Sequence, residues 1–249
     1  MMKINILIIV LLLVNSSAKA QVLISLLLGD KLNSGKIEFG LDGGMNFATI
    51  SGLNDVKSLR PFNLGFYFDI KTKNPSLMIN TGVIVKSTMG ADNLAVYSTG
   101  DAVLDSAFRG GKVERRINYF NVPVLVKYRF SNNIYVKAGI QLGLRYNANN
   151  IFVNSKTAEE DLKYTLKIKD QFHPLDAGMA FGIGYRLMKG SGMNIGVQYY
   201  FGLVDIVIDD ASPKQYNRSL YLTAGIPIGA NKAKKKAEKK SEESINTNY

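Results

Sequence analysis

The chain has 249 residues, of which 46% are hydrophobic and 20% charged, with no cysteine, no tryptophan and one histidine, His173. These counts exclude a thiol nucleophile, a disulfide framework and a metal site built from thiolates or several histidines. The formal net charge is +11, but part of this excess lies at the two ends of the chain, and no basic cluster is interleaved with aromatic residues as in single-strand binding proteins. We expect one domain with no cofactor, no metal and no nucleic acid partner.

The amino terminus has the pattern of a signal peptide. Lys3 precedes an unbroken apolar run over residues 6–14, and Ala18-Lys19-Ala20 is a small-residue cleavage site. The alternative is a membrane helix that continues through residues 22–28, but polar residues interrupt that run and neither half reaches the roughly 20 residues that a spanning helix needs. We predict a signal peptide over residues 1–20 and a periplasmic segment over residues 21–35.

From residue 36 onward, apolar and polar residues alternate in short segments. In residues 134–147 one face carries Ile, Val, Ala, Ile, Leu, Leu and Tyr, while the other carries Tyr, Lys, Gly, Gln, Gly and Arg. This period of two is typical of a β-strand with two different faces. Seven further segments follow the same rule: residues 37–47, 62–70, 77–86, 120–130, 175–187, 193–202 and 219–228.

Eight strands of about membrane-crossing length predict an all-β fold, an eight-stranded antiparallel up-and-down transmembrane β-barrel over residues 36–229. The alternative is a soluble lipocalin-like barrel, which places its apolar face inside. The polar faces are rich in glycine and carry charges of both signs, which suits a narrow lumen, whereas the apolar faces carry large aliphatic residues and end in Tyr and Phe. The membrane barrel is therefore favoured.

The segments between the strands alternate in length. Long segments cover residues 50–60, 88–114, 148–172 and 204–215, and short ones cover residues 71–75, 131–133 and 188–192. Outer-membrane barrels have long extracellular loops and short periplasmic turns. This predicts the outer membrane of a Gram-negative-type bacterium, with both termini in the periplasm and residues 230–249 as a charged periplasmic tail.

Apolar residues also occur in the long loops over residues 88–114 and 151–170. They predict hairpins that extend beyond the membrane, with loops that pack on one another or present a surface to a partner. Within a strand, Pro123 removes a ladder hydrogen bond, so we expect a bulge or an unpaired position there.

The predicted polar faces place ionisable side chains inside the barrel. Acidic residues of the first two strands would face basic residues of strands four to six, pair across the lumen and plug it, and Arg145 would pair with Asp176 near the outer rim. The alternative is a narrow path for ions or solutes. The predicted structural network comprises Glu38, Asp42, Asp69, Lys127, Arg129, Lys137, Arg145, Asp176 and Arg186.

Catalysis has little support in the sequence. His173 lies near Asp176 at the predicted outer rim, where a Ser-His-Asp arrangement would be conceivable, but no G-x-S-x-G motif accompanies it. Asp205, Asp209 and Asp210 lack the ligand spacing of a calcium loop. We predict that the protein is not an enzyme.

Several motifs resemble the PorT-like small outer-membrane β-barrel proteins. They are GDKLNS at residues 29–34 followed by EFGLDGG at 38–44, NVPVLVKY at 121–128, and YYFGL at 199–203 followed by YNRS at 216–219. The resemblance covers roughly residues 22–229 and implies the fold, the outer-membrane location and the strand proline, which recurs in the family. It leaves the activity open, and here a charged tail follows the last strand, where such barrels usually end on an aromatic residue.

Together these observations predict a small outer-membrane barrel with a plugged lumen and a structural or interaction role, as a candidate subunit of an envelope or secretion assembly. Its expected partners are outer-membrane lipid and an envelope protein bound by the extracellular loops or the N-terminal segment. The first alternative is a transport barrel for narrow solutes, and the second is a membrane enzyme at the rim.

Overall fold

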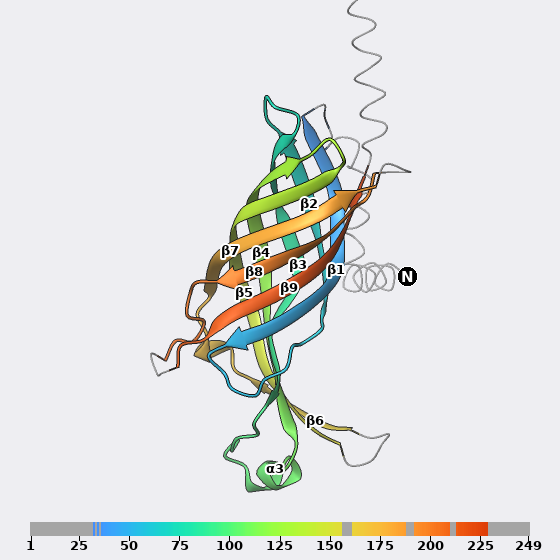
Figure 1. The fold of residues 1–249 in the computed structure, drawn as a ribbon. Helices are drawn as coiled ribbons and strands as arrows, with labels where there is room; N and C mark the ends of the chain where they lie inside the picture. The colour runs from blue at the N-terminus through green and yellow to red at the C-terminus, as the bar shows by residue number, and fades with distance from the viewer. Residues whose placement is uncertain are drawn as a thin grey trace, which may run out of the picture.

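A computed structural model describes residues 32, 34, 36–155, 161–187, 192–209 and 213–228 (Figure 1). The predicted signal peptide over residues 1–20 and the predicted tail over residues 230–249 lie outside the described residues. The same holds for all but two residues of the predicted periplasmic segment over residues 21–35.

The described residues form a closed antiparallel β-barrel. The elements are β1 (Ile37–Ser51), β2 (Phe62–Lys71), β3 (Leu77–Leu94), α3 (Ala102–Ala107), β4 (Lys112–Arg129), β5 (Ile134–Ser155), β6 (Asp161–Lys167), the 3-10 helix η1 (Lys169–Gln171), β7 (Leu175–Arg186), β8 (Asn194–Gly202) and β9 (Tyr216–Pro227). Each strand from β1 to β5 pairs with the next, β5 pairs with β7, the strands from β7 to β9 pair in sequence, and β1 pairs with β9, so the sheet closes. Because β6 pairs only with the far part of β5, eight strands make the ring, as predicted.

The barrel has two different ends (Figure 1). One end, here called the inner end, carries the short turns, such as the one between β2 and β3. The other, here called the outer end, carries α3 and β6, which project beyond the ring at the bottom of Figure 1. No helix in the described part of the chain is long and apolar enough to cross a membrane.

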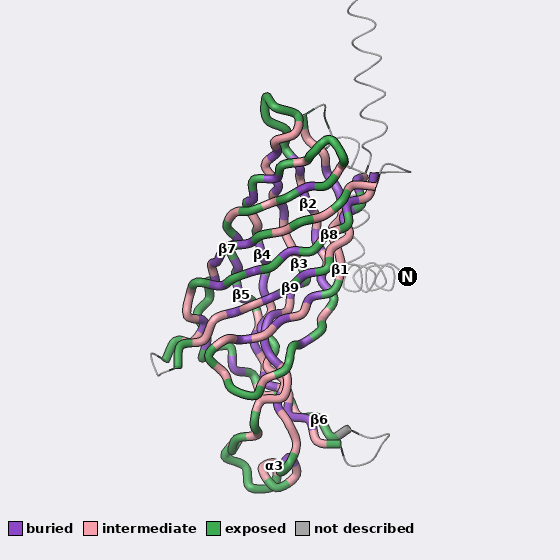
Figure 2. Tube along the Cα trace, in the orientation of Figure 1, coloured by how far each residue is buried: buried purple, intermediate pink, exposed green. Residues whose placement is uncertain are grey.

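Side chains alternate between the lumen and the outer wall, as the sequence predicts. On β5, Tyr135 and Gln141 are buried in the lumen, whereas Ile140 and Leu144 on the opposite face are about half exposed. The same alternation of buried and exposed positions runs around the ring (Figure 2). Large apolar side chains therefore cover the wall, and polar ones point inward.

Three strands extend farthest beyond their predicted ends. Strand β3 continues outward to Leu94, β4 already begins at Lys112, and β5 continues outward to Ser155. In β5 the pairing changes from Tyr119↔Arg145 to Asn118↔Asn147, so Tyr146 is an extra residue that shifts the alternation by one. A similar irregularity lies between Ile84 and Ser87 of β3. The predicted strand ends near residues 86 and 147 are wrong because a bulge there reverses which residues face inward.

Pro123 lies at an interrupted part of the ladder, as predicted. The pairs Thr81↔Val124 and Ile84↔Asn121 flank it, and the two positions between them have no pair across the β3–β4 interface. The Thr81 hydroxyl instead donates a hydrogen bond to the Pro123 carbonyl at 2.8 Å. The missing N–H of the proline therefore faces a gap in the pairing.

The two longest hairpins extend beyond the ring and pack against each other. Phe108, which follows α3, contacts the rings of Phe152 on β5 and Tyr164 on β6 at centroid distances of 5.8 and 6.3 Å. Asp101 caps α3 by accepting hydrogen bonds from the amides of the first turn. We call this unit, from residue 95 to 111 together with β6 and the far part of β5, the outer module. The predicted extension and packing of these loops are confirmed.

Candidate functional site

The lumen begins at the inner end with an ion pair that spans it. Both guanidinium Nη atoms of Arg186 on β7 lie 2.8 Å from the carboxylate oxygens of Glu38 on β1. The Tyr67 hydroxyl donates a hydrogen bond to Glu38 Oε1, and Asn194 donates one to the Tyr67 oxygen. A bidentate pair of this kind fixes the direction of both side chains, so it crosses the lumen at a defined place.

A second ion pair is almost fully buried. Lys127 Nζ lies 2.6 Å from Asp69 Oδ2, and the two side chains are 4% and 2% exposed. The other carboxylate oxygen accepts a hydrogen bond from Asn80 at 2.7 Å, and the Lys127 ammonium lies 4.4 Å from the ring centre of Tyr135. Each charge thus has a partner, which a buried pair needs to offset its loss of hydration.

Tyr67 and Tyr135 fill the remaining space in the inner half of the lumen, because glycines lie beneath their rings. A Cβ added to Gly40 would lie 2.4 Å from the Tyr67 ring, and one added to Gly184 would lie 2.3 Å from the Tyr135 ring. Only a residue without a side chain permits such close approach. The prediction of a charge network omitted these tyrosines, although an aromatic residue on a glycine-rich face is a signal that would have identified them.

Asp42 and Lys137 face a small internal cavity of about 20 Å³. Asn63 and Gln198 also line it, and the Oδ1 atom of Asn63 is buried without a hydrogen-bond partner in the described part of the chain. A cavity of this size, lined in part by polar side chains, has room for about one water molecule. Within the described part of the chain, neither Asp42 nor Lys137 forms an ion pair.

Three of the predicted network residues have other surroundings. Arg145 does not pair with Asp176, because its guanidinium donates to the backbone carbonyls of Phe172 and His173, whereas Asp176 Oδ2 accepts a hydrogen bond from Asn217 at 2.8 Å. The expectation of an Arg145–Asp176 pair is therefore wrong: the loop before β7 supplies carbonyls to the arginine. Arg129, half-buried at the inner end, forms no ion pair within the described ranges.

Toward the outer end, an apolar cluster fills much of the lumen beside buried polar residues such as Asn46 and Asn217. Strand residues such as Met89, Tyr119 and Tyr200 are buried there together with residues of the loops. The loop residues, which no strand pattern predicts, are Leu59, Ile168, Phe172 and Ile206. Phe172 is 1% exposed and is held by a β-bridge to Val207. The loops therefore fold into the barrel mouth and close it with an apolar core.

His173 is exposed at this rim, and its backbone amide donates to the Ile206 carbonyl. Its side chain forms no hydrogen bond with a serine or an aspartate among the residues described, and Asp176 is engaged by Asn217. The structure thus does not bring together the triad that the sequence left conceivable. The described residues also contain no group of three His, Cys, Asp or Glu side chains that would hold a metal.

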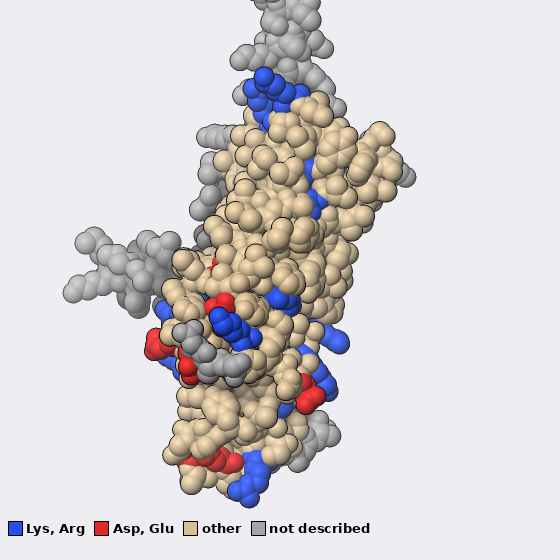
Figure 3. Space-filling view, turned by 60° about the vertical axis from the view of Figure 1, so that its left-hand side comes forward, with Lys and Arg blue, Asp and Glu red and all other residues tan. Residues whose placement is uncertain are grey.

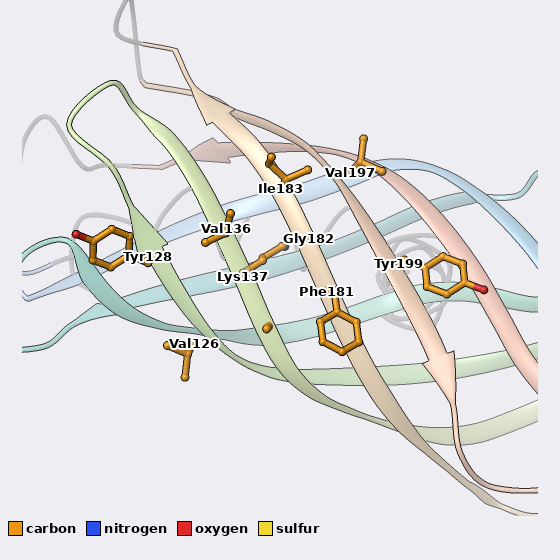
Figure 4. A pocket seen from close by; sticks show the side chains of 10 residues that line it. Val126, Tyr128, Val136, Lys137, Phe181, Gly182, Ile183, Val197 and Tyr199 are labelled. Carbon is orange, nitrogen blue, oxygen red and sulfur yellow. The ribbon is translucent and has the colours of Figure 1, made fainter.

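The outer wall carries a shallow hollow of about 650 Å³ over β4, β5, β7 and β8 (Figure 4). Phe181 and Tyr199 are partners on neighbouring strands, as are Ile183 and Val197, and they project from the wall around the hollow. Its lining is almost wholly apolar. Figure 3 shows one side of the molecule, on which charged side chains gather toward the two ends and the wall between them is mostly uncharged.

Residues 20–207 match the family described as the outer membrane protein beta-barrel domain. The chain belongs to this family. This outer membrane beta-barrel domain explains the uncharged wall, because lipid hydrocarbon covers it. No curated protein matches the chain in sequence.

Solved outer-membrane barrels are similar in structure. Ail, the attachment invasion locus protein of Yersinia pestis, is 12% identical with a TM-score of 0.39, and the match covers 78% of this chain and 99% of Ail. Neisserial surface protein A is 14% identical with the same TM-score, over 78% of this chain and 96% of that protein. The N-terminal β-barrel domain of Pseudomonas aeruginosa OprF is 8% identical with a TM-score of 0.25, over 76% and 97%.

Proposed function

We propose that the protein is a structural or interaction barrel of the outer membrane whose lumen is plugged by its own side chains. The observation that carries this proposal is the double closure of the lumen: the pairs Glu38–Arg186 and Asp69–Lys127 cross its inner half, and the apolar core with Phe172 fills its outer half. A solute would have to break both a set of buried charge pairs and a packed core. The role as a subunit of an envelope or secretion assembly, and the more specific PorT-like membership, are part of this proposal.

The proposal includes an orientation. The outer end faces the cell exterior and both termini lie in the periplasm, since long loops and short turns are distributed in this way in bacterial barrels. Because the chain has no cysteine, single cysteines test the orientation cleanly. We expect a membrane-impermeant maleimide to label Val103→Cys in α3 on intact cells, and to label Lys73→Cys in the β2–β3 turn only after the outer membrane is permeabilised. The reverse pattern would contradict the orientation.

The outer module is the proposed contact for an envelope partner. Val103 is 78% exposed on α3, and Tyr97 and Leu162 are about 40% exposed nearby in the module. Exposed apolar residues on an ordered extension are typical of protein contact surfaces. Crosslinking from a photoreactive residue at position 103 in intact cells should yield a defined protein adduct. The same residue at position 73 serves as the control, and identical adducts from both positions would argue against a specific contact.

Conductance in planar lipid bilayers tests the plug. We expect no stable open pore from the native barrel, and none from Lys127→Ala combined with Arg186→Ala, because the apolar core of the outer half stays in place. A stable conductance from the native protein would overturn the plugged-lumen proposal. It would favour the alternative, transport of a narrow solute, for which the polar cavity beside Asp42 and Lys137 is the one supporting observation.

A further inference from the structure

A second hollow lies on the outside of the barrel at its outer end. It has a volume of about 680 Å³ and is formed by the β1–β2 loop together with the outer parts of β3 and β4. The residues that define its chemistry are Lys57, Arg60, Thr88, Asp92, Glu114 and Arg116. We call this hollow the basic groove.

The two carboxylates of the basic groove already have cationic partners. Asp92 Oδ2 lies 2.8 Å from Lys112 Nζ, and Glu114 Oε2 accepts hydrogen bonds from Arg116 at 2.8 and 3.1 Å. Lys57 and Arg60 are exposed and have no carboxylate partner among the described residues. The groove therefore has two cations available for an anion from outside the chain.

The loop that carries these two cations is fixed in place. Lys57 exchanges two backbone hydrogen bonds of 2.8 Å with Asp92 on β3, and Leu59 exchanges two of 2.9 and 3.0 Å with Ala48 on β1. Leu59 is buried at 6% exposure in the apolar core of the outer half. Since the backbone on both sides of Ser58 is held, little ordering of the loop is needed when a ligand binds.

The basic groove lies just beyond the apolar wall. Phe62, at 49% exposure, and the ring pair Phe120–Tyr146, with a centroid distance of 4.6 Å, mark the outer limit of that wall. Arg60 is two residues beyond Phe62, and Arg116 is four residues beyond Phe120. Four residues span about 13 Å along an extended strand, and less when measured along the axis of the barrel, because the strands are tilted. Aromatic girdles lie at the interface between hydrocarbon and headgroups. The groove is thus at the depth of the headgroups.

We infer that the basic groove binds the phosphate groups of lipid headgroups in the leaflet around the outer end. An arginine presents several donors to a phosphate, and a lysine supplies a point charge beside it. The inference rests on the proposed function and deepens it. The proposed orientation determines only which leaflet of the membrane supplies the lipid. A fixed headgroup contact here would hold the barrel at a set depth and order the lipid next to the outer module.

Lipid binding to the folded, detergent-purified barrel, measured by native mass spectrometry, tests the inference. The probe is lipid A, a disaccharide lipid that bears phosphates, and the comparison is its dephosphorylated form. We expect binding of the phosphorylated lipid to weaken by about tenfold in the double variant Lys57→Gln/Arg60→Gln, since two charge-assisted contacts are lost. The control Lys36→Gln/Lys73→Gln, which removes the same charge at the inner end, should bind like the native chain.

Three outcomes would overturn the inference: equal binding by the native chain and the Lys57→Gln/Arg60→Gln variant, equal binding of phosphorylated and dephosphorylated lipid, or full competition by inorganic phosphate at equal concentration, which would indicate a free-anion site. Unchanged electrophoretic mobility of the folded variants shows that the barrel is intact. Failure of the orientation is seen separately by cysteine labelling. Reversed labelling with intact lipid binding would overturn the orientation alone, whereas correct labelling without lipid binding would overturn the groove alone.

Discussion

The inner and outer halves of the lumen are closed by different physical means. In the inner half, the strands alone supply the plug, as ion pairs such as Asp69–Lys127 and tyrosines seated on glycines. In the outer half, strand residues and loop residues such as Phe172 form an apolar core. The stability of the inner plug depends on whether each of a few buried charges keeps its partner. The stability of the outer core depends on how well the loops fill the barrel mouth. The two halves should therefore respond to mutation in different ways.

The largest effect is expected in the inner half from Lys127→Ala. The substitution leaves the Asp69 carboxylate buried without its cation, and removal of one partner of a buried pair costs about 3–5 kcal/mol. The free energy of unfolding in urea, followed in lipid vesicles by the mobility shift of the folded barrel on gels, measures this loss. In the double variant Asp69→Leu/Lys127→Met the loss should be much smaller, because no charge is left alone. A double variant as unstable as Lys127→Ala would contradict the ionic account.

In the outer half, Phe172→Ala should lower the free energy of unfolding by about 3 kcal/mol. This is the low end for truncating a buried phenylalanine, because loops relax around a cavity more easily than strands do. The same urea titration measures it, and Val103→Ala on the exposed surface of α3 is the control, expected to change stability by less than about 0.5 kcal/mol. Equal effects of the two substitutions would mean that the loops do not form a packed core.

A smaller effect is expected from Gly40→Ala, which tests the seat of Tyr67. The added Cβ would lie 2.4 Å from the Tyr67 ring and 2.6 Å from the Ile226 carbonyl oxygen, and such overpacking costs about 1–3 kcal/mol. Gly43→Ala is the matched control on the same strand, where the nearest atom is 3.3 Å away. We expect the urea midpoint to fall for the first variant and to change little for the second.

The smallest effect concerns pH and the outer module. The Ser98 hydroxyl, and then the amide and hydroxyl of Thr99, hold the pKa of Asp105 below its usual value of 3.8. A lowered folded-state pKa means that this contribution is fully present above about pH 4 and is lost as the pH falls further. The protection of the Thr99 amide from hydrogen exchange, taken relative to the intrinsic exchange rate at each pH, should fall below about pH 4, and Asp105→Asn should remove this pH dependence without changing protection in β4.

The sequence predicts the ring well and the mouth poorly. Alternation on β4, β5 and β7 assigns Lys127, Lys137 and Arg186 to the lumen because one face of each strand must meet lipid. It does not say which acid each one meets, since that depends on strand order around the closed ring and on the tilt. Asp69 pairs directly with Lys127 and also accepts a hydrogen bond from Asn80 on the strand between them, whereas Arg145 takes backbone carbonyls that only the folded loop presents.

The identity of the buried residues in the outer part was missed for a different reason. The bulge at Tyr146 reverses the inward face of β5, so Ala148 and Phe152 are buried where simple alternation would expose them. A single inserted residue leaves no distinctive mark in one sequence. The loop residues Ile168 and Phe172 are buried by contacts between segments distant in the chain, which no local pattern encodes.

The length of β4 and β5 has a mechanical consequence. The two strands stay paired from the Lys112↔Val153 rung beside the outer module to the Arg129↔Tyr135 rung at the inner end. A force applied to the outer module along the barrel axis would pull β4 and β5 in the same direction and load the ladder between β5 and β7 in shear, across many hydrogen bonds at once, instead of opening it one bond at a time. An attachment made at the outer module would therefore be anchored in the whole height of the barrel wall.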